Sequence, residues 1–331
     1  HPMSSSSLRE FGKCPLRWIR GYNPPESKAK DFGSVLDCLL LTPKQFEARY
    51  VVQPATYESK GMECPECGSV TDSKKCAKCN VQRREVTVTK DWSNQSTTCA
   101  AWTEQQIAAG KEIVSEETVL DCAAAIARVQ QDEILSSFID ASDKQVLIKG
   151  EWHDPKTGLK IPVQCLIDLA PREDTEFASS LGDFKSCRFA GQEAFRRAAT
   201  KQYRYDVQGA LDLALWNAAT GEERTTWCWV LQESYEPWQT GRRIMGQNYA
   251  LPRANATYKR LLENYCACLK SGKWPDYEDT DEGNVQGWSV VEIDERDAID
   301  EQFAPKFIFK DGDFEVETPG EEGTDPDDVP H

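Results

Sequence analysis

Two short stretches decide the fold of this chain, Gln164-Cys165-Leu166-Ile167-Asp168-Leu169 and Leu181-Gly182-Asp183-Phe184-Lys185-Ser186. Each places charged residues inside an apolar, strand-like segment. Successive side chains of a strand point to opposite faces, so Asp183 and Lys185 lie on the same face. If the two strands pair, Asp168 comes alongside Asp183, where an apolar core would exclude two carboxylates. The two stretches therefore predict a polar site built on a sheet.

The segments around these stretches predict a mixed α/β fold. Apolar positions with helical spacing fill residues 116–138, and a helical region follows the strands at 190–218. The predicted strands are residues 146–153, 160–169, 181–187 and 225–232. This αβββαβ order predicts a mixed sheet with helices on its faces. Further helices are expected at 31–41 and 252–269.

The paired carboxylates predict a hard divalent cation at this site. Mg²⁺ takes oxygen ligands and keeps several waters, and it compensates the charge of Asp168 and Asp183. The ammonium group of Lys185 then lies beside the cation, where it can hold or activate an attacking water. Such an arrangement suits metal-assisted hydrolysis of a phosphodiester.

The order of the polar residues resembles the PDDEXK nuclease superfamily, and within it the RecE and lambda-exonuclease branch of phage-type DNA exonucleases. The likeness runs from about Ser4 to Tyr277. A lone D-x-K pattern is common by chance, so the order of several pieces carries the resemblance. Those pieces are Lys13-Cys14-Pro15-Leu16-Arg17-Trp18, Phe32-Gly33-Ser34-Val35-Leu36-Asp37, Lys90-Asp91-Trp92, Glu151, Asp168, Asp183-x-Lys185, Tyr205-x-x-Gln208 and Gly272-Lys273-Trp274-Pro275.

The resemblance implies a restriction-endonuclease-like core and a set of site residues. The implied ligands of catalytic Mg²⁺ (or Mn²⁺) are Asp168, Asp183, the backbone carbonyl of Phe184, Glu151 and Asp37. Lys185 would offset charge on the phosphate. Gln208 would orient Lys185 or the water and, with Tyr205, contact the DNA backbone. The family has a tyrosine where Asp212 stands here, which puts that contact in doubt.

Plainer interpretations remain open for two of these features. Asp183 and Lys185 can form an ordinary exposed ion pair on an edge strand, which contributes less than about 1 kcal/mol. The accompanying Glu151, Asp168 and Gln208 favour the catalytic interpretation. Asp37 stands where the family has a histidine, and it can be an oxygen ligand or a solvent-facing or capping residue.

Four cysteines interrupt the chain in two C-x-x-C pairs, Cys64-Pro65-Glu66-Cys67 and Cys76-Ala77-Lys78-Cys79. Four thiolates at this spacing suit tetrahedral Zn²⁺, and Gly68 and Asn80 allow the tight turn after each pair. Because sulfur fills all four positions, the zinc should be structural. We expect a zinc ribbon over residues 61–82, inserted in a nuclease domain of residues 4–275. It either staples a loop or contacts DNA through Lys74, Lys75, Lys78, Arg83 and Arg84.

Charge and composition narrow the classes of protein. The net charge of −16 comes from residues 276–331, which carry 20 acidic and 3 basic residues, whereas the remainder is nearly neutral. This acidic C-terminal extension is expected to be partly disordered. With three histidines, two of them at the chain ends, a Ser-His-Asp mechanism is set aside. Scattered cysteines and the lack of a long apolar run lead us to expect a cytoplasmic protein, in a bacterial or phage-infected cell.

From the resemblance, the expected activity is a Mg²⁺-dependent exonuclease that digests linear double-stranded DNA from 5′ to 3′ in phage-type recombination. The implied partners are DNA and a single-strand annealing protein, and the implied assembly is a homo-oligomeric ring. The alternative is a DNA- or protein-binding module that has lost catalysis and keeps a structural zinc ribbon. The residues at Asp37 and Asp212 favour the alternative, and Asp168, Asp183 and Lys185 argue against it.

Overall fold

The computed structural model describes residues 2–21, 28–277, 284–285 and 288–289. The chain divides into two compact units, residues 1–280 and 281–331. In the second unit, β12 (Asn284–Val285) and β13 (Trp288–Ser289) pair antiparallel. The acidic extension predicted over 276–331, and its expected partial disorder, otherwise lie outside the described residues.

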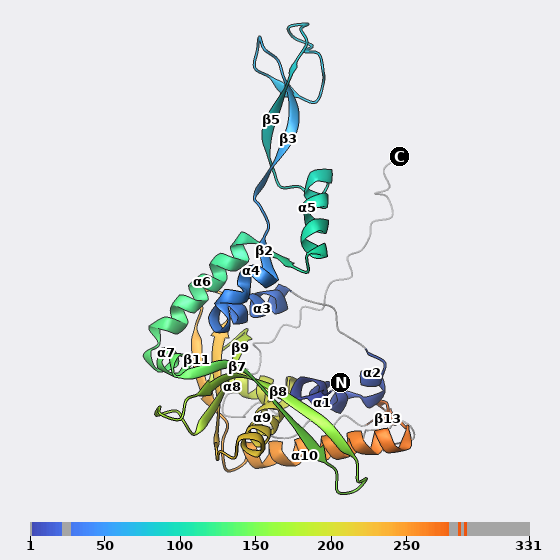
Figure 1. The fold of residues 1–331 in the computed structure, drawn as a ribbon, viewed down its shortest axis with the longest axis vertical. Coiled ribbons are helices and arrows are strands. Elements are labelled where there is room, and N and C mark those ends of the chain that lie inside the picture. The colour runs from blue at the N-terminus through green and yellow to red at the C-terminus, as the bar shows by residue number, and fades with distance from the viewer. Residues whose placement is uncertain (1, 22–27, 278–283, 286–287, 290–331) are drawn as a thin grey trace, which may run out of the picture. The chain divides into compact units, whose positions relative to one another are not determined.

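A mixed six-stranded sheet forms the centre of the first unit (Figure 1). Its order is β1-β8-β9-β10-β11, and β7 pairs with β8. The pairs β7–β8 and β10–β11 are antiparallel, and β9–β10 and β1–β8 are parallel. The strands are β1 (Met3–Ser4), β7 (Ser142–His153), β8 (Lys160–Pro171), β9 (Ser180–Cys187), β10 (Thr226–Glu233) and β11 (Thr240–Ile244). The four predicted strands are confirmed, whereas β1 has no signal in the sequence because it is two residues long.

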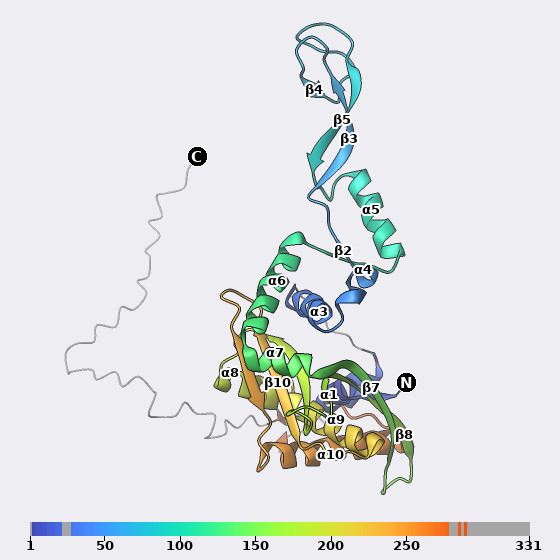
Figure 2. The same cartoon turned by 60° about the vertical axis from the view of Figure 1, so that its left-hand side comes forward.

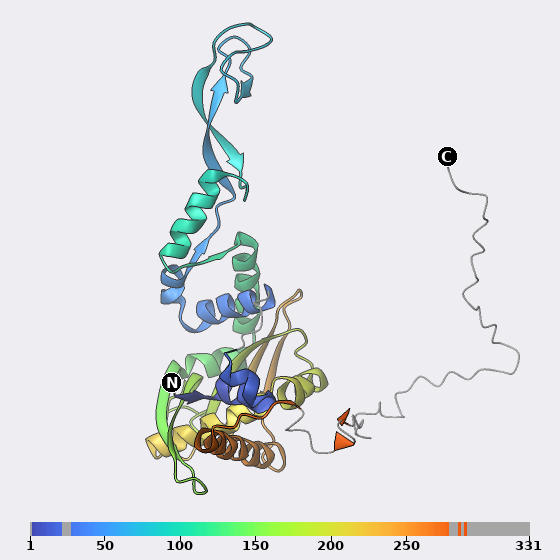
Figure 3. The ribbon, with the colours of Figure 1, turned by 90° about the vertical axis from the view of Figure 1, so that its right-hand side faces the viewer.

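Helices cover both faces of this sheet (Figures 1 and 3). On one face α9 (Tyr205–Thr220) packs on β7, β8 and β10, and α1 (Ser5–Lys13) and α10 (Ala250–Ser271) pack on α9. On the other face lie α3 (Lys28–Leu41), α6 (Glu116–Gln131) and α7 (Glu133–Asp140). Side chains of β10 point alternately to the two faces of the sheet, and each face has its own hydrophobic core. Trp227 and Leu231 belong to the core under α9, and Val230 belongs to the core under α3, α6 and α7.

The helix predicted over 116–138 is divided in the structure, and so is the helical apolar pattern that residues 8–19 show in the sequence. Asp132 ends α6 and begins α7, because its carboxylate accepts hydrogen bonds from the backbone N–H groups of Ile134 and Leu135. The helical pattern near the N-terminus breaks between α1 and α2 (Pro15–Ile19), where Pro15 takes the first helical position. In both cases a capping or proline signal overrides a continuous apolar pattern.

A separate three-stranded sheet carries the cysteine pairs (Figure 2). Its long strands β3 (Thr56–Glu63) and β5 (Arg84–Asp91) are antiparallel, and β4 (Val70–Thr71) pairs with the end of β3. This ribbon is therefore longer than the predicted 61–82. The other elements of the unit are η1 (Pro43–Gln45), α4 (Phe46–Arg49), β2 (Tyr50–Val52), α5 (Thr97–Ala108), β6 (Glu112–Val114), α8 (Gln192–Arg197) and the π-helical η2 (Ala198–Gln202).

Within the described residues, no helix combines the length and the apolar character needed to cross a lipid bilayer.

Candidate active site

The candidate site lies where β8 and β9 separate. The two strands pair at Leu169 and Gly182, which places Asp168 and Asp183 opposite each other in the next antiparallel position. The backbone pairing of β8 with β9 ends at this point. The N–H of Phe184 donates instead to a side chain, to Oδ2 of Asp168 at 3.0 Å. The opening between the strands therefore holds both carboxylates, as the sequence predicts.

Asp183 is the hub of the site. Its side chain is 3% exposed, and its Oδ1 accepts hydrogen bonds from Nζ of Lys185 at 2.5 Å and from Nε2 of Gln208 at 2.9 Å. Its other oxygen, Oδ2, is buried and has no hydrogen-bond partner among the described residues. Lys185 also donates to the carbonyl of Phe184, at 3.3 Å. The exposed ion pair considered from the sequence is therefore excluded, because this pair is buried.

Asp168 is held by a neighbour that the sequence analysis missed. Nε2 of Gln145, from β7, donates to Oδ1 of Asp168 at 2.9 Å. Gln145 has a left-handed backbone, with φ of 56°, at the position of β7 opposite Asp168. Positive φ in a residue other than glycine is uncommon and costs free energy, and here it accompanies a contact to a site residue.

Helix α3 brings Asp37 to the same cluster. It packs on β9 so closely at Gly33 that a Cβ there would lie 2.5 Å from Oγ of Ser186. Asp37 follows one turn later, and Oδ1 of its carboxylate is buried with no hydrogen-bond partner among the described residues. Asp37 does not cap α3, because it lies inside the helix, and its side chain is partly buried. The charges of Lys185 and Asp183 both act on it.

Helix α9 also packs very closely on the sheet, at Gly209. A Cβ at Gly209 would lie 2.6 Å from the ring of Trp227 in β10, so only glycine allows this helix–sheet distance. The neighbouring Gln208 is thereby brought within hydrogen-bonding distance of Asp183. Asp212, one turn further, is 1% exposed and lies inside the molecule. Asp212 therefore does not reach the surface, where it could contact DNA.

Tyr205 lies between the site and the surface. Its ring centroid is 5.3 Å from Nζ of Lys185 and 5.3 Å from the guanidinium carbon of Arg9. Arg9 in turn donates to the carbonyl of Tyr203 at 2.7 Å. Arg9 belongs to α1, far away in sequence, so no local pattern predicts its place.

Glu151 is not brought into the cluster. It is exposed on β7, where it lies opposite Pro162 and hydrogen-bonds Nε2 of His153 at 2.6 Å. Pro162 and Asp168 are six residues apart on β8, or about 20 Å at the rise of an extended strand. The structure thus separates Glu151 from Asp168, Asp183 and Asp37.

Burial and mutual repulsion shape the protonation of the cluster. The pKa of Asp37 is raised to about 6: burial is the main cause, Asp183 adds to the rise, and Lys185 and Arg49 oppose it. Burial, followed by the charge of Asp183, raises the pKa of both Asp168 and Asp212 well above the usual value. Burial opposes the charged form of Lys185, but Asp183 and Asp168 outweigh it and raise the pKa of this lysine. Lys185 is therefore an ammonium ion at neutral pH and not a base.

The donor set of this site fits a hard divalent cation. Three carboxylates repel one another, and Asp183 and Asp37 each keep a buried oxygen without a partner among the described residues. Positive charge is what such a cluster lacks. Among the described residues, these oxygens do not all lie within 4.8 Å of one another, as the cysteine sulfurs do. Asp37, Asp168 and Asp183 are the residues that would hold such an ion.

The four cysteines form a closed cluster in the ribbon. The sulfurs of Cys64, Cys67, Cys76 and Cys79 all lie within 4.8 Å of one another. Each pair is closed by the same turn, in which the N–H of Gly68 or Asn80 donates to the carbonyl of the first cysteine, at 2.9 and 2.8 Å. Both turn residues have positive φ, of 68° and 60°. The cluster has the ligands and geometry to bind a metal such as zinc.

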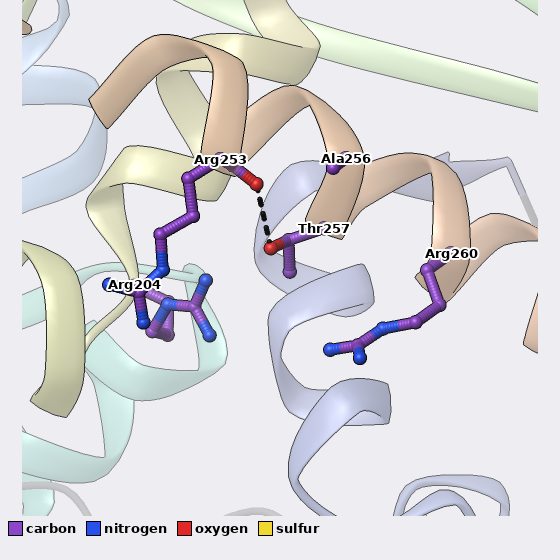
Figure 4. A pocket seen from close by; sticks show the side chains of 5 residues that line it. All are labelled: Arg204, Arg253, Ala256, Thr257 and Arg260. Carbon is purple, nitrogen blue, oxygen red and sulfur yellow. Dashed lines mark hydrogen bonds between the residues drawn. The ribbon is translucent and has the colours of Figure 1, made fainter. Parts of the chain in front are cut away.

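An arginine hollow lies beside the first turn of α9 (Figure 4). Arg204 precedes α9, and Arg253, Thr257 and Arg260 come from one side of α10. The guanidinium group of Arg204 also pairs with Asp206, at 3.1 Å. Figure 4 shows the side chains of Arg204 and Arg253 directed towards each other. Three guanidinium groups in one hollow favour an anion, such as a phosphate.

The sheet, the helices on both faces and the Asp-Asp-x-Lys cluster define a PDDEXK-like domain. The sequence profile of the PDDEXK-like domain of unknown function DUF3799 matches residues 4–283, and the chain belongs to this family. Proteins with a PDDEXK fold typically use Mg²⁺. The fold therefore suggests that this protein is a nuclease. None of the curated proteins matches the sequence.

The solved structures that are similar to this chain include two crystal structures. The crystal structure of a candidate exonuclease from Eubacterium rectale is 14% identical, with 84% of this chain and 85% of that one covered at a TM-score of 0.47. The crystal structure of SSO0001 is 13% identical, with 52% and 68% covered at a TM-score of 0.29. At these TM-scores neither likeness adds to the argument from the site.

Proposed function

We propose that this protein is a Mg²⁺-dependent exonuclease of the RecE and lambda-exonuclease kind, which hydrolyses linear double-stranded DNA from 5′ to 3′. The observation that carries the proposal is the hub at Asp183, where a buried carboxylate meets the ammonium of Lys185 and the amide of Gln208 beside Asp168. A single-strand annealing partner and a ring-shaped homo-oligomer belong to the same proposal, on the resemblance alone.

The protein's own residues have distinct tasks in this reaction. Lys185 presents a fixed positive charge to the phosphate, because its raised pKa keeps it protonated. Gln208 holds Asp183 through one oxygen and leaves the other oxygen available to a cation. When bound, a divalent ion supplies the charge that activates water and stabilises the phosphate.

The surroundings of the site suit a polyanion. The arginine hollow is formed by Arg204 and the two arginines of α10. Arg204 directly precedes Tyr205, whose ring lies 5.3 Å from Nζ of Lys185. A DNA strand whose phosphate meets Lys185 would find further cationic partners there. We propose that this hollow holds a neighbouring backbone phosphate. Zinc in the cysteine cluster would be structural and would staple the ribbon.

The proposal is tested by incubating the protein with end-labelled linear duplex and with closed circular duplex, in Mg²⁺ or in EDTA. We expect Mg²⁺-dependent loss of the linear DNA alone, and loss of the 5′ label first. Lys185→Ala should abolish the activity, whereas Lys149→Ala, an exposed lysine on β7, should retain it. DNA binding without hydrolysis would instead favour the binding module, and cutting of the circle would contradict an exonuclease.

A further inference from the structure

A groove rich in aromatic side chains begins directly beside the candidate site. It has a volume of about 740 Å³, and it is lined by Ser186, which follows Lys185, and by Tyr205, whose ring lies 5.3 Å from Nζ of Lys185. Its other aromatic residues are Phe189, Phe195, Tyr203 and Tyr235. We refer to this feature as the aromatic groove.

The aromatic side chains of the groove are unusually accessible. Phe189, Tyr203 and Tyr235 are 57%, 44% and 61% exposed. Side chains of this size favour burial, so their gathering on one surface marks a binding site better than scattered exposure would. These three side chains do not belong to the hydrophobic core, unlike aromatic residues such as Trp227, which is 1% exposed.

Three rings of the groove stack on one another, and a fourth lies under an arginine. Tyr203 and Tyr205 stack with their centroids 5.3 Å apart and their planes at 21°, and Phe195 continues the stack at 6.3 Å and 22°. Arg188 lies over the ring of Phe189, with 5.3 Å between its guanidinium carbon and the centroid. Because Tyr205 is stacked on both neighbours and Phe195 is buried, the exposed rings of Phe189, Tyr203 and Tyr235 are the ones that can offer a face to a nucleobase. Exposed rings beside a cation are the features that bind nucleobases next to their phosphates.

The backbone at Arg204 separates the groove from the arginine hollow. This residue has a left-handed conformation, with φ of 53°, although it is not glycine. Tyr203 and Tyr205 therefore both line the aromatic groove, while Arg204 between them lines the hollow in Figure 4. The left-handed residue thus stands where the chain passes from one surface to the other, and such strain is often found at functional sites.

We propose that the aromatic groove binds unpaired bases of the DNA strand that enters the site. In a duplex the faces of the bases are covered by their neighbours, so only bases released from the duplex can stack on these rings. The inference rests on the proposed nuclease function and adds a base-binding surface, built from the exposed rings of the groove, beside Lys185. The groove is then a positioning surface for the strand and takes no part in the chemistry.

The test is binding in EDTA, which separates it from hydrolysis. Fluorescence anisotropy compares a labelled single strand with an abasic strand of equal length, which carries the same phosphates without bases. Wild type should bind the intact strand at least about tenfold more tightly, since each stacked base contributes measurably. Tyr235→Ala and Phe189→Ala should reduce this preference and leave binding of the abasic strand unchanged.

Tyr249→Ala is the matched control, because Tyr249 is 86% exposed and does not line the groove. Circular dichroism verifies that each variant is folded. Equal binding of both strands by wild type, or an unchanged preference in both groove variants, would overturn the inference. So would a shift of oligomeric state in Tyr235→Ala without a base preference, which would assign the groove to a second copy of the chain. DNA hydrolysis without a base preference refutes the groove alone, whereas a base preference without hydrolysis refutes the nuclease proposal alone.

Discussion

The cysteine cluster and the aspartate cluster are two candidate metal sites built in opposite ways. The cysteine cluster takes four soft ligands from 16 consecutive residues and closes them with two matching turns. The aspartate cluster takes hard ligands from α3, β8 and β9 and adds a lysine and a glutamine. One site completes a local structure and leaves no open position. The other is assembled by the whole fold and keeps buried oxygens in need of charge.

This difference predicts that the two sites respond differently to metal removal. The ribbon should depend on its metal for its structure, because binding of structural zinc contributes roughly 10–16 kcal/mol in small zinc domains. The nuclease domain should remain folded without its cation, since two hydrophobic cores support it on both faces of the sheet.

The largest expected effect is therefore on the ribbon. Cys76→Ser should lower the zinc content from one per chain to near zero and expose residues 62–83 to limited proteolysis, while DNA hydrolysis changes by less than about tenfold if zinc only staples this loop. Cys228→Ser, a half-buried cysteine of β10 outside the cluster, is the control. A loss of hydrolysis comparable to that of a site mutant would assign the ribbon a part in DNA binding.

The second effect is on catalysis. Asp183→Asn should reduce DNA hydrolysis about a thousandfold, because the hub loses the charge that holds Lys185 and a cation. Initial rates on linear duplex measure the loss. Asp143→Asn, which changes an exposed aspartate of β7, should retain the wild-type rate. Activity of Asp183→Asn within tenfold of wild type would remove this carboxylate from the mechanism.

The third effect is on stability as a function of pH. Asp37 binds its proton more tightly in the folded state, with a pKa raised from 3.8 to about 6. Between these values the unfolded state holds fewer protons, so the stability of the metal-free protein should fall as pH rises from about 4 to about 6, by up to about 3 kcal/mol.

Thermal unfolding in EDTA and in Mg²⁺ across this range checks the prediction. Mg²⁺ should raise the melting temperature increasingly as the carboxylates ionise, and Asp37→Asn should flatten the part of the pH dependence that Asp37 causes. Stability that rises through the same window would show that Asp37 is stabilised as an anion without a metal.

The smallest expected effect is at Gln208. Gln208→Ala removes one hydrogen bond to Asp183, so kcat should fall about tenfold while KM changes little. Steady-state kinetics separates the two parameters. A rise in KM with constant kcat would show that Gln208 binds DNA and does not position Asp183.

The same difference in construction explains what the sequence could predict. All four cysteines were predictable because their geometry follows from local spacing. Asp183 and Lys185 were predictable from strand alternation, and Asp168 from the pairing of adjacent strands. Their partners were not, because Gln145 depends on a left-handed backbone in β7 and Arg9 on the packing of α1 against α9.

Glu151 shows the limit of matching motif order. It has the residue type and the order along the chain that the resemblance requires, yet β7 carries it to the far part of β8, opposite Pro162. Asp37, which departs from the family pattern, is the acidic residue that packing brings in, because Gly33 lets α3 approach β9. Distance along the strands decided the outcome for Glu151, and the packing of α3 on β9 decided it for Asp37.

Anomalous diffraction from crystals grown with Mn²⁺, recorded at the manganese and zinc absorption edges, tests the contrast between the two sites most directly. We predict a manganese peak between Asp168 and Asp183, within ligand distance of Asp37, and a zinc peak at the centre of Cys64, Cys67, Cys76 and Cys79. Zinc at the cysteines with no manganese between the aspartates, in crystals that bind Mn²⁺ elsewhere or not at all, would contradict the account.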